Sequence, residues 1–165
     1  FALGTAGLLA AGGLAMQRRD WTRTSVRVVE ALVYTKVVTG LAKSVLNRSR
    51  PFVGSGPLTA DPGAFSSDHG KLSMPSGHTA RAFAVASVLA HRAGRWYVSV
   101  PVYGVAASVG MERVRSGDHW LTDVMVGGAL GYLIGRSVAA SPATSGEVTY
   151  TPILGTDRVG LSVRF

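Results

Sequence analysis

Three long runs without a charged residue, at residues 1–17, 96–111 and 124–135, constrain most strongly what this chain can fold into. Each run is shorter than the roughly 20 apolar residues that a membrane-spanning helix needs. The chain is therefore either a compact helical domain with very apolar helices or a membrane domain whose helix ends carry functional charges. The first run ends at a basic flank, Arg18-Arg19, and fits either a membrane-inserted segment or a buried helix.

Apolar spacing and helix-breaking residues predict about five helices. We expect them at residues 2–16, 23–47, 77–90, 97–114 and 119–139. The second carries apolar residues at helical spacing over most of its length, namely Val26, Val29, Val33, Val37, Leu41 and Val45. Pro51 is expected to close this helix, and Asp118 is expected to cap the fifth.

The fifth expected helix contains Gly127, Gly131 and Gly135, four residues apart, and this spacing permits close helix–helix approach in a membrane or in a soluble bundle. Near the C-terminus, two stretches at residues 148–154 and 159–165 flank a Gly-Thr-Asp turn, and the second alternates apolar with other residues. This pattern predicts a terminal β-hairpin.

The expected fold is thus all-α, a helical bundle of about five helices with a C-terminal β-hairpin. The helical domain covers residues 1–140, with its motifs between residues 43 and 123, and the tail covers residues 141–165. The chain is 47% apolar and 16% charged, which excludes an intrinsically disordered protein. It has no cysteine, which excludes disulfides, thiolate metal sites and cysteine nucleophiles.

The net charge of +8 points to an anionic partner. Its basic residues are scattered, and no basic run is interleaved with aromatic residues, so we expect no nucleic-acid partner. An anionic small substrate or an anionic membrane surface fits this charge.

Three segments pair cationic or histidine side chains with the end of an expected helix. In the first, Lys43 and Arg50 lie seven residues apart, so on a helix their side chains point in nearly the same direction. The second, Pro-Ser-Gly-His at residues 75–78, opens a helix, where the first N–H groups attract phosphate. A histidine at such a position can transfer a proton to a leaving group.

The third segment contains Arg113, His119 and Asp123. On a helix, His119 and Asp123 share one face, so the carboxylate can hold one ring nitrogen and leave the other as a nucleophile. Arg113 offers a bidentate fork for phosphate oxygens. Because short turns join the last three helices, successive helices should run antiparallel, and the three segments should meet at one end of the bundle.

Together, the three segments resemble the signature of the type 2 phosphatidic acid phosphatase superfamily, which also contains the vanadium haloperoxidases and bacterial class A acid phosphatases. Its pattern is Lys-x6-Arg-Pro, then Pro-Ser-Gly-His, then Ser-Arg-x5-His-x3-Asp, and the chain matches it in order and spacing. The resemblance covers residues 33–136. One position departs, because Glu112 stands where the family usually has Ser or another small residue. Its carboxylate opposes an anion if it faces the pocket, and is harmless if it points away.

The resemblance implies a phosphatase that needs no metal and no cofactor. In this interpretation His119 attacks phosphorus and forms a phosphohistidine, Asp123 orients His119, and His78 protonates the leaving group. The phosphoryl oxygens are held by the remaining matched residues, which are Lys43, Arg50, Arg113 and the amides near Ser76 and Gly77.

We therefore expect an enzyme of the cell envelope, membrane-associated or periplasmic, and the resemblance implies an extracytoplasmic active site. The apolar surface and the basic excess favour a lipid phosphate, such as phosphatidic acid, phosphatidylglycerol phosphate or a polyprenyl diphosphate. Two alternatives stay open. One is a vanadate-dependent haloperoxidase, in which vanadate binds to the same cationic side chains as phosphate would. The other is an anion-binding membrane protein without catalysis.

Overall fold

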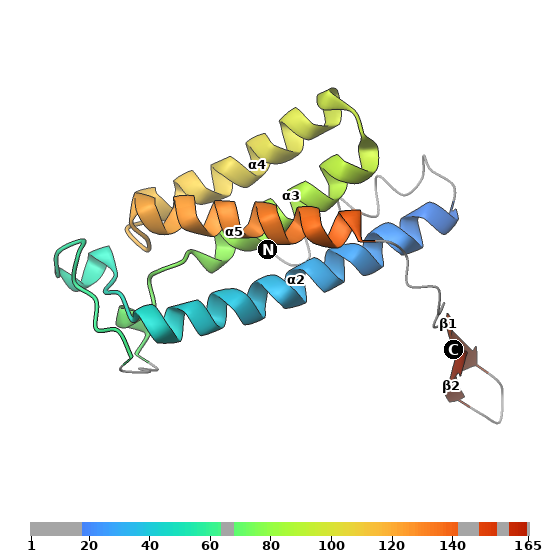
Figure 1. Ribbon diagram of the computed structural model, residues 1–165, viewed down its shortest axis with the longest axis horizontal. Coiled ribbons are helices and arrows are strands. Elements are labelled where there is room, and N and C mark those ends of the chain that lie inside the picture. Colours follow the sequence, from blue (N-terminus) through green and yellow to red (C-terminus); the bar gives the residue numbers. More distant parts are fainter. Residues whose placement is uncertain (1–17, 64–67, 142–148, 155–158, 165) are drawn as a thin grey trace.

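The computed structural model describes residues 18–63, 68–141, 149–154 and 159–164. The elements in these ranges are α2 (Arg18–Leu46), η2 (Pro51–Val53), η3 (His69–Lys71), α3 (Gly77–Ala93), α4 (Trp96–Arg115), α5 (Leu121–Ala140), β1 (Thr149–Leu154) and β2 (Val159–Arg164). The four α-helices pack into one bundle, so the all-α architecture is confirmed for the described residues between 18 and 141 (Figure 1). The helix expected at residues 2–16 lies outside the described residues.

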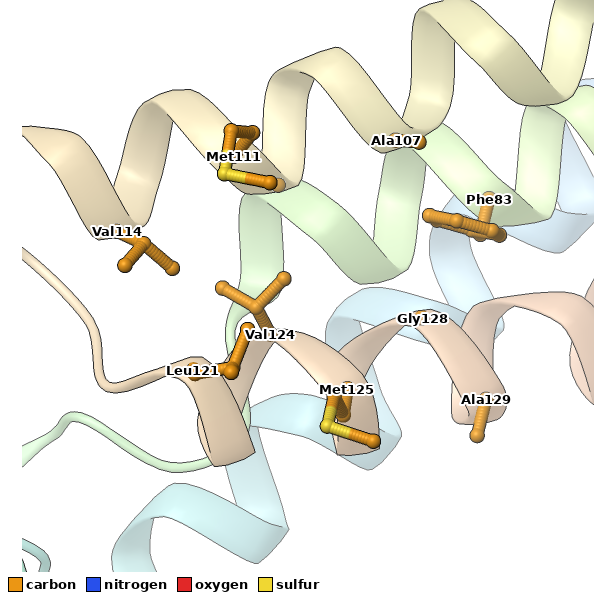
Figure 2. Close-up of a pocket in the computed structure, with 10 residues that line it drawn as sticks. Phe83, Ala107, Met111, Val114, Leu121, Val124, Met125, Gly128 and Ala129 are labelled. Atoms are coloured by element: carbon orange, nitrogen blue, oxygen red, sulfur yellow. The ribbon is translucent and has the colours of Figure 1, made fainter.

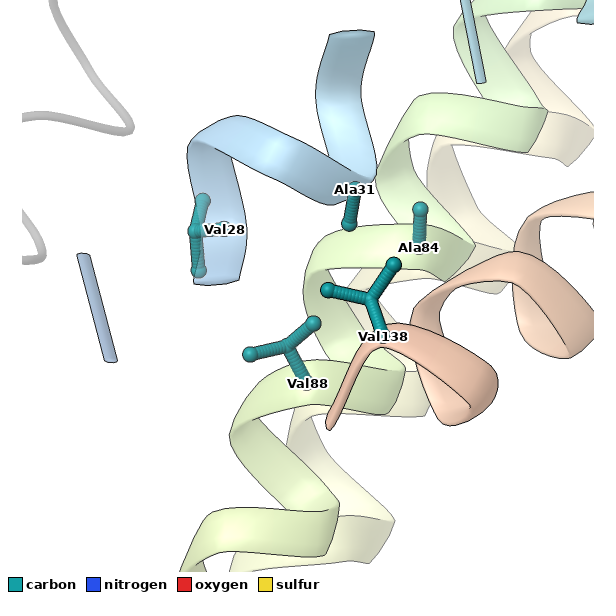
Figure 3. Packing of buried hydrophobic residues seen from close by; sticks show 5 residues of the cluster. All are labelled: Val28, Ala31, Ala84, Val88 and Val138. Carbon is teal, nitrogen blue, oxygen red and sulfur yellow. The ribbon is translucent and has the colours of Figure 1, made fainter. Parts of the chain in front are cut away.

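The central helix of the bundle is α3, which contacts α2, α4 and α5 (Figure 1). The buried cluster between α2, α3 and α5 is built from small and β-branched side chains, namely Val28, Ala31, Ala84, Val88 and Val138 (Figure 3). Within the described residues, none of the helices combines the length and the apolar character required to cross a membrane.

The apolar row of α2 faces away from this bundle. Its side chains are between 50% and 65% exposed at Val26, Val29, Val33, Val37, Leu41 and Val45. The buried side of α2 instead carries Val28, Ala31, Thr35 and Thr39. Both threonine hydroxyls donate to the carbonyl four residues earlier, over 2.6 and 2.7 Å, which allows these side chains to be buried. Helical spacing thus predicted the helix, but small and internally bonded residues form its packed face.

Helix α2 begins at Arg18, five residues before the expected start at Arg23, and its end agrees with the expected end to one residue, but the segment that follows differs. The helix stops at Leu46, and Asn47 adopts a left-handed conformation with φ of 47°, which asparagine tolerates better than most residues. Pro51 does not close α2 but opens the short helix η2. Arg50 is therefore not on the helix that carries Lys43, and the shared helix face expected for these two residues is wrong.

The start of α5 also differs. The helix begins at Leu121 with Trp120 as its N-cap, and the Trp120 amide donates to Asp123 Oδ2 over 2.9 Å. Asp118 is not the cap, because it lies in the preceding turn, where it accepts from Arg113 and Ser116. His119 consequently precedes the helix, and its alignment with Asp123 does not come from a common helix face.

The glycines of α5 face the backbone of α3. A Cβ atom added at Gly131 would overlap the carbonyl group of Ala80, and one added at Gly135 would overlap that of Ala84. These glycines therefore set how closely α3 and α5 approach.

Replacing Gly131 by alanine is expected to lower the free energy of unfolding by about 1–3 kcal/mol, because the obstructing atoms belong to backbone and cannot rotate away. Gly104→Ala in α4 is the matched control. A Cβ there meets nothing within 4 Å, so alanine should raise stability by up to about 1 kcal/mol through helix propensity. Denaturant titration measures both changes, and equal effects would contradict the packing argument.

Strands β1 and β2 pair antiparallel, with Thr149 opposite Arg164 and Leu154 opposite Val159. Figure 1 shows this small sheet apart from the helices. The turn expected to join the strands, at residues 155–158, lies outside the described residues, so the hairpin and the division of the chain at residue 141 stay predictions.

Candidate active site

The chemistry-bearing segments meet at one end of the bundle, where α2 and α4 end and α3 and α5 begin (Figure 1). The Ser76 amide at the start of α3 donates to the Asp123 carbonyl over 2.9 Å. The Trp120 indole N–H donates over 3.0 Å to the carbonyl of Ser49, which follows α2. The Lys43 side chain passes next to Gly77, whose added Cβ would lie 3.9 Å from Lys43 Cε.

His119 and Asp123 form the buried part of this site. Their side chains are 2% and 0% exposed, and His119 Nδ1 lies 3.7 Å from Asp123 Oδ2. This separation is longer than a hydrogen bond, and Nδ1 has no other hydrogen-bond partner among the described residues. The Asp123 carboxylate is nevertheless an acidic group within 4 Å of this nitrogen and can hold its proton once the two atoms approach to hydrogen-bond distance.

Asp123 is held from several directions. Arg48 Nη1 lies 2.6 Å from Oδ1, and the Ser73 hydroxyl donates to Oδ2 over 2.5 Å. Burial alone would raise the pKa of Asp123, but the contact with His119, the Ser73 hydroxyl, the Trp120 amide and the Arg48 charge together hold that pKa below its usual value. The carboxylate is therefore ionised at neutral pH.

The role of Arg48 was not predicted from the sequence, although this residue lies inside the first segment. Its side chain is buried, and besides Asp123 it donates to Thr122 Oγ1 over 2.8 Å and to the Pro57 carbonyl. Trp120 lies beside its guanidinium, 6.0 Å from the ring centroid. A basic residue just after a helix is usually solvated, so only its burial in the tertiary structure identifies it.

Lys43 supplies a partly buried cation to the site. Its ammonium group donates to the carbonyls of Leu72 and Ser73. Burial, followed by the positive charges of Arg50 and Arg81, lowers the pKa of Lys43 to about 8, although Asp123 opposes the shift. Arg81 is a second residue near the site that was not predicted from the sequence. It lies one turn after Gly77 on α3 and donates from Nε to the Gly77 carbonyl over 3.1 Å.

The affinity of the site for sulfate is expected to fall as the pH rises through about 8, because the Lys43 ammonium then loses the charge that attracts an anion. Sulfate is chosen because its own charge is constant in this range. Lys43→Met should bind sulfate weakly with little pH dependence, whereas Lys36→Met, an exposed position on the same helix, should behave as the unchanged protein. Calorimetric titration at several pH values measures this, and a decline that persists in Lys43→Met would assign it to another group.

Two carboxylates face the arginines of the site. Asp118 Oδ2 lies 3.0 Å from Arg113 Nη1, and its Oδ1 lies 3.9 Å from Arg50 Nη1. A hydrogen bond from Ser116, followed by the charges of Arg113 and Arg50, outweighs burial and lowers the pKa of Asp118. Glu112 does not point away from the site residues, because its carboxylate accepts from Arg113 Nε over 2.6 Å. A phosphate that binds Arg113 thus competes with two carboxylates.

The start of α3 places His78 near these cations. Partial desolvation of its ring, followed by the positive charges of Arg81 and Arg113, lowers the pKa of His78. Ser76 is fully buried, and its amide donates to the Asp123 carbonyl, so this N–H is not available to bind an anion as the family resemblance implied. The Gly77 amide has no protein acceptor within the described residues.

Among the described residues, no group of three or more histidine or acidic side chains is arranged to hold a metal ion. Among the sequence-predicted residues, Arg50 and Arg113 share Asp118 as a partner, and His119 lies beside Asp123. Lys43 and His78 lie close enough to these groups for neighbouring charges to shift their pKa values. The arrangement offers a buried, carboxylate-backed imidazole beside several cations, which suits attack on an anionic phosphorus centre.

Comparison with known proteins identifies relatives and a family of this chain. Over 67 residues, or 39% of this chain and 15% of the relative, the chain is 46% identical to the lipid A 1-phosphatase of Porphyromonas gingivalis. It therefore spans only a small part of that protein. The fold is similar to the crystal structure of Aquifex aeolicus LpxE, with a TM-score of 0.56 and 24% identity over 81% of this chain and 74% of that one. The family model of the PAP2 superfamily matches residues 24–147, more than half of the chain. The motif resemblance is thus confirmed, and the chain belongs to the PAP2 superfamily.

Proposed function

We propose that this chain is a phosphatase that hydrolyses a phosphomonoester or diphosphate, with a phosphorylated lipid as its substrate. The observation that carries the proposal is the buried pair of His119 and ionised Asp123 beside the cations Lys43, Arg50 and Arg113. Family membership supports a hydrolase, and the name of the Porphyromonas gingivalis relative supports a lipid substrate.

In the proposed reaction, His119 Nε2 attacks phosphorus, so an N–P bond forms while the P–O bond to the leaving group breaks. Asp123 keeps the proton on Nδ1, which leaves Nε2 free to attack. His78 gives its proton to the leaving oxygen. Water then attacks the phosphohistidine, so a P–O bond forms while the N–P bond to His119 breaks, His78 accepts a proton from that water, and inorganic phosphate leaves. Charge on the phosphoryl oxygens is stabilised by the remaining cations, which are Lys43, Arg50 and Arg113.

His78 requires its proton for the first step, although neighbouring cations lower its pKa in the free site. A bound phosphate dianion offsets the charges of Arg81 and Arg113, and so raises the pKa of His78 when substrate is present. The substrate thereby helps to create the protonated form of its own general acid.

We place the enzyme in the cell envelope at a membrane surface, with its active site on the extracytoplasmic side, as the family resemblance implies. The net positive charge suits an anionic surface, and the exposed apolar row of α2 suits an apolar neighbour.

Phosphate release is expected from phosphatidic acid, from a polyprenyl diphosphate and from a soluble aryl phosphate, and it should persist in the presence of a chelator. Vanadate should inhibit, because it adopts the trigonal-bipyramidal geometry of the transition state. A colorimetric phosphate assay, with bromide oxidation by peroxide as a parallel assay, measures these outcomes. Activity that is lost with chelator and restored by a divalent metal would contradict the proposed mechanism. Halide oxidation with vanadate, without phosphate release, would favour the haloperoxidase alternative.

A further inference from the structure

An apolar groove runs between α4 and α5, with Phe83 of α3 at its base (Figure 2). Its cavity volume is about 310 Å³. The walls include Ala107, Met111 and Val114 from α4 and Leu121, Met125 and Ala129 from α5. No lining side chain is polar. A sugar or a peptide backbone would therefore lose its hydrogen bonds to water in this groove without replacement.

One end of the groove is lined by residues that lie next to site residues in the sequence. Val114 directly follows Arg113, and Leu121 lies two residues after His119. From these residues the groove continues along both helices to Ala107 and Ala129 (Figure 2). At 1.5 Å per residue, it extends about 10 Å away from the site. A molecule whose phosphate contacts Arg113 thus has an apolar channel beginning next to that phosphate.

The walls are only partly covered by the protein itself. Met111, Leu121 and Met125 are 50%, 57% and 64% exposed. Methionine side chains adapt to an irregular apolar neighbour, and burying such exposed apolar surface is favourable. The volume lies at the lower end of the range for small-molecule pockets, which suits one narrow hydrocarbon chain and not several.

We propose that the groove between α4 and α5 binds one hydrocarbon chain of the substrate while its phosphate lies among the cations at the end of the bundle. The proposal rests on the proposed function, because it assigns a position to the apolar part of the lipid phosphate. Each methylene that enters the groove contributes about fourfold to binding. The affinity for a lipid phosphate should therefore rise with the length of its hydrocarbon chain. It should level off once this hydrocarbon chain extends past the distal residues Ala107 and Ala129.

The test uses alkylphosphonates, from ethyl to dodecyl, whose C–P bond phosphatases of this chemistry do not cleave. Their binding to the whole chain is measured by calorimetry below the concentrations at which they form micelles. Affinity is expected to increase about fourfold per methylene and then to reach a plateau. No binding, or affinity that is independent of chain length, would overturn the proposal.

Two variants that fill the groove from opposite walls, Ala107→Phe and Ala129→Phe, should flatten this dependence on chain length. Both alanines are exposed, so the larger side chain can be accommodated without breaking the core. The matched control is Ala140→Phe, at an exposed position of α5 outside the groove. This variant should retain the dependence of affinity on the length of the hydrocarbon chain. An unchanged dependence in both filled variants would overturn the proposal. A changed oligomeric state with unchanged dependence would do so too, and would assign the groove to contact between copies of the chain.

The two proposals fail in different ways. If no phosphate ester is hydrolysed but the binding of alkylphosphonates still depends on chain length and on Ala129, the proposed function is wrong and the groove assignment stands. If long and short phosphate esters are hydrolysed with the same kcat/KM and the phosphonates show no dependence on length, the function stands and the groove assignment is wrong.

Discussion

His119→Ala is expected to abolish phosphate release, because the imidazole supplies the proposed nucleophile and its neighbours cannot replace it. Asp123→Asn should lower kcat by a factor of about 10²–10⁴, since an amide does not hold the proton on Nδ1 as a carboxylate does. Both effects are measured by initial rates on an alkyl and an aryl phosphate.

His91→Ala is the matched control for the nucleophile. This histidine is exposed in the last turn of α3, at the opposite end of the helix from His78, and its loss should leave the rate unchanged. Trapping of labelled phosphate on the unchanged protein after an acid-free quench should find it bound to nitrogen, and none should be found on His119→Ala. Full turnover by His119→Ala would rule out the proposed mechanism.

Arg48→Met is expected to reduce both stability and activity, because it leaves the buried carboxylate of Asp123 without its closest cation. Removing one partner of a buried ion pair typically costs about 3–5 kcal/mol. The pKa of Asp123 should also rise, since one of the causes that lower it is gone. The acidic limb of the kcat/KM profile should therefore move to higher pH, which a purely structural loss would not produce.

Matched variants separate these effects of Arg48. Arg95→Met removes an exposed arginine at the start of α4 and should change neither stability nor the pH profile. Arg48→Met combined with Asp123→Asn should cost less stability than the sum of the single changes, because the amide carries no charge to be left unpaired. Denaturation curves and pH profiles measure both points. Additive losses would mean that Arg48 does not act through Asp123.

Helices α3 and α4 could be predicted from the sequence to within a few residues, because the Gly77 start, the Gly94 stop and the long apolar runs are local signals. The boundaries at the site were harder to predict. A left-handed turn at Asn47 follows α2, and the Asp123 carboxylate caps α5 at Trp120. The Asn47 carbonyl accepts from Asp61, and Arg48 and Ser73 fix the Asp123 carboxylate, so contacts with other segments, which local propensity does not contain, hold both places.

The candidate site could also be predicted only in part from the sequence. Motif spacing predicted the residue types that meet, because short turns bring alternate helix ends together. It did not predict that Glu112 binds Arg113, that the Ser76 amide is engaged by Asp123, or that Arg48 is buried. These outcomes depend on which side chains compete for the same partner once the helices have packed.

The sequence by itself determined the family, the order of the helices and the set of groups available for chemistry. Only the tertiary structure decided which face of each helix is buried. It also decided which charged side chains pair with one another. The apolar row of α2, from Val26 to Val45, illustrates the reason. Periodicity places residues on a common face, but whether that face is covered depends on the neighbouring helices. Close packing on α3 selected the smaller side chains of α2, such as Ala31 and Thr35, and left the larger ones exposed.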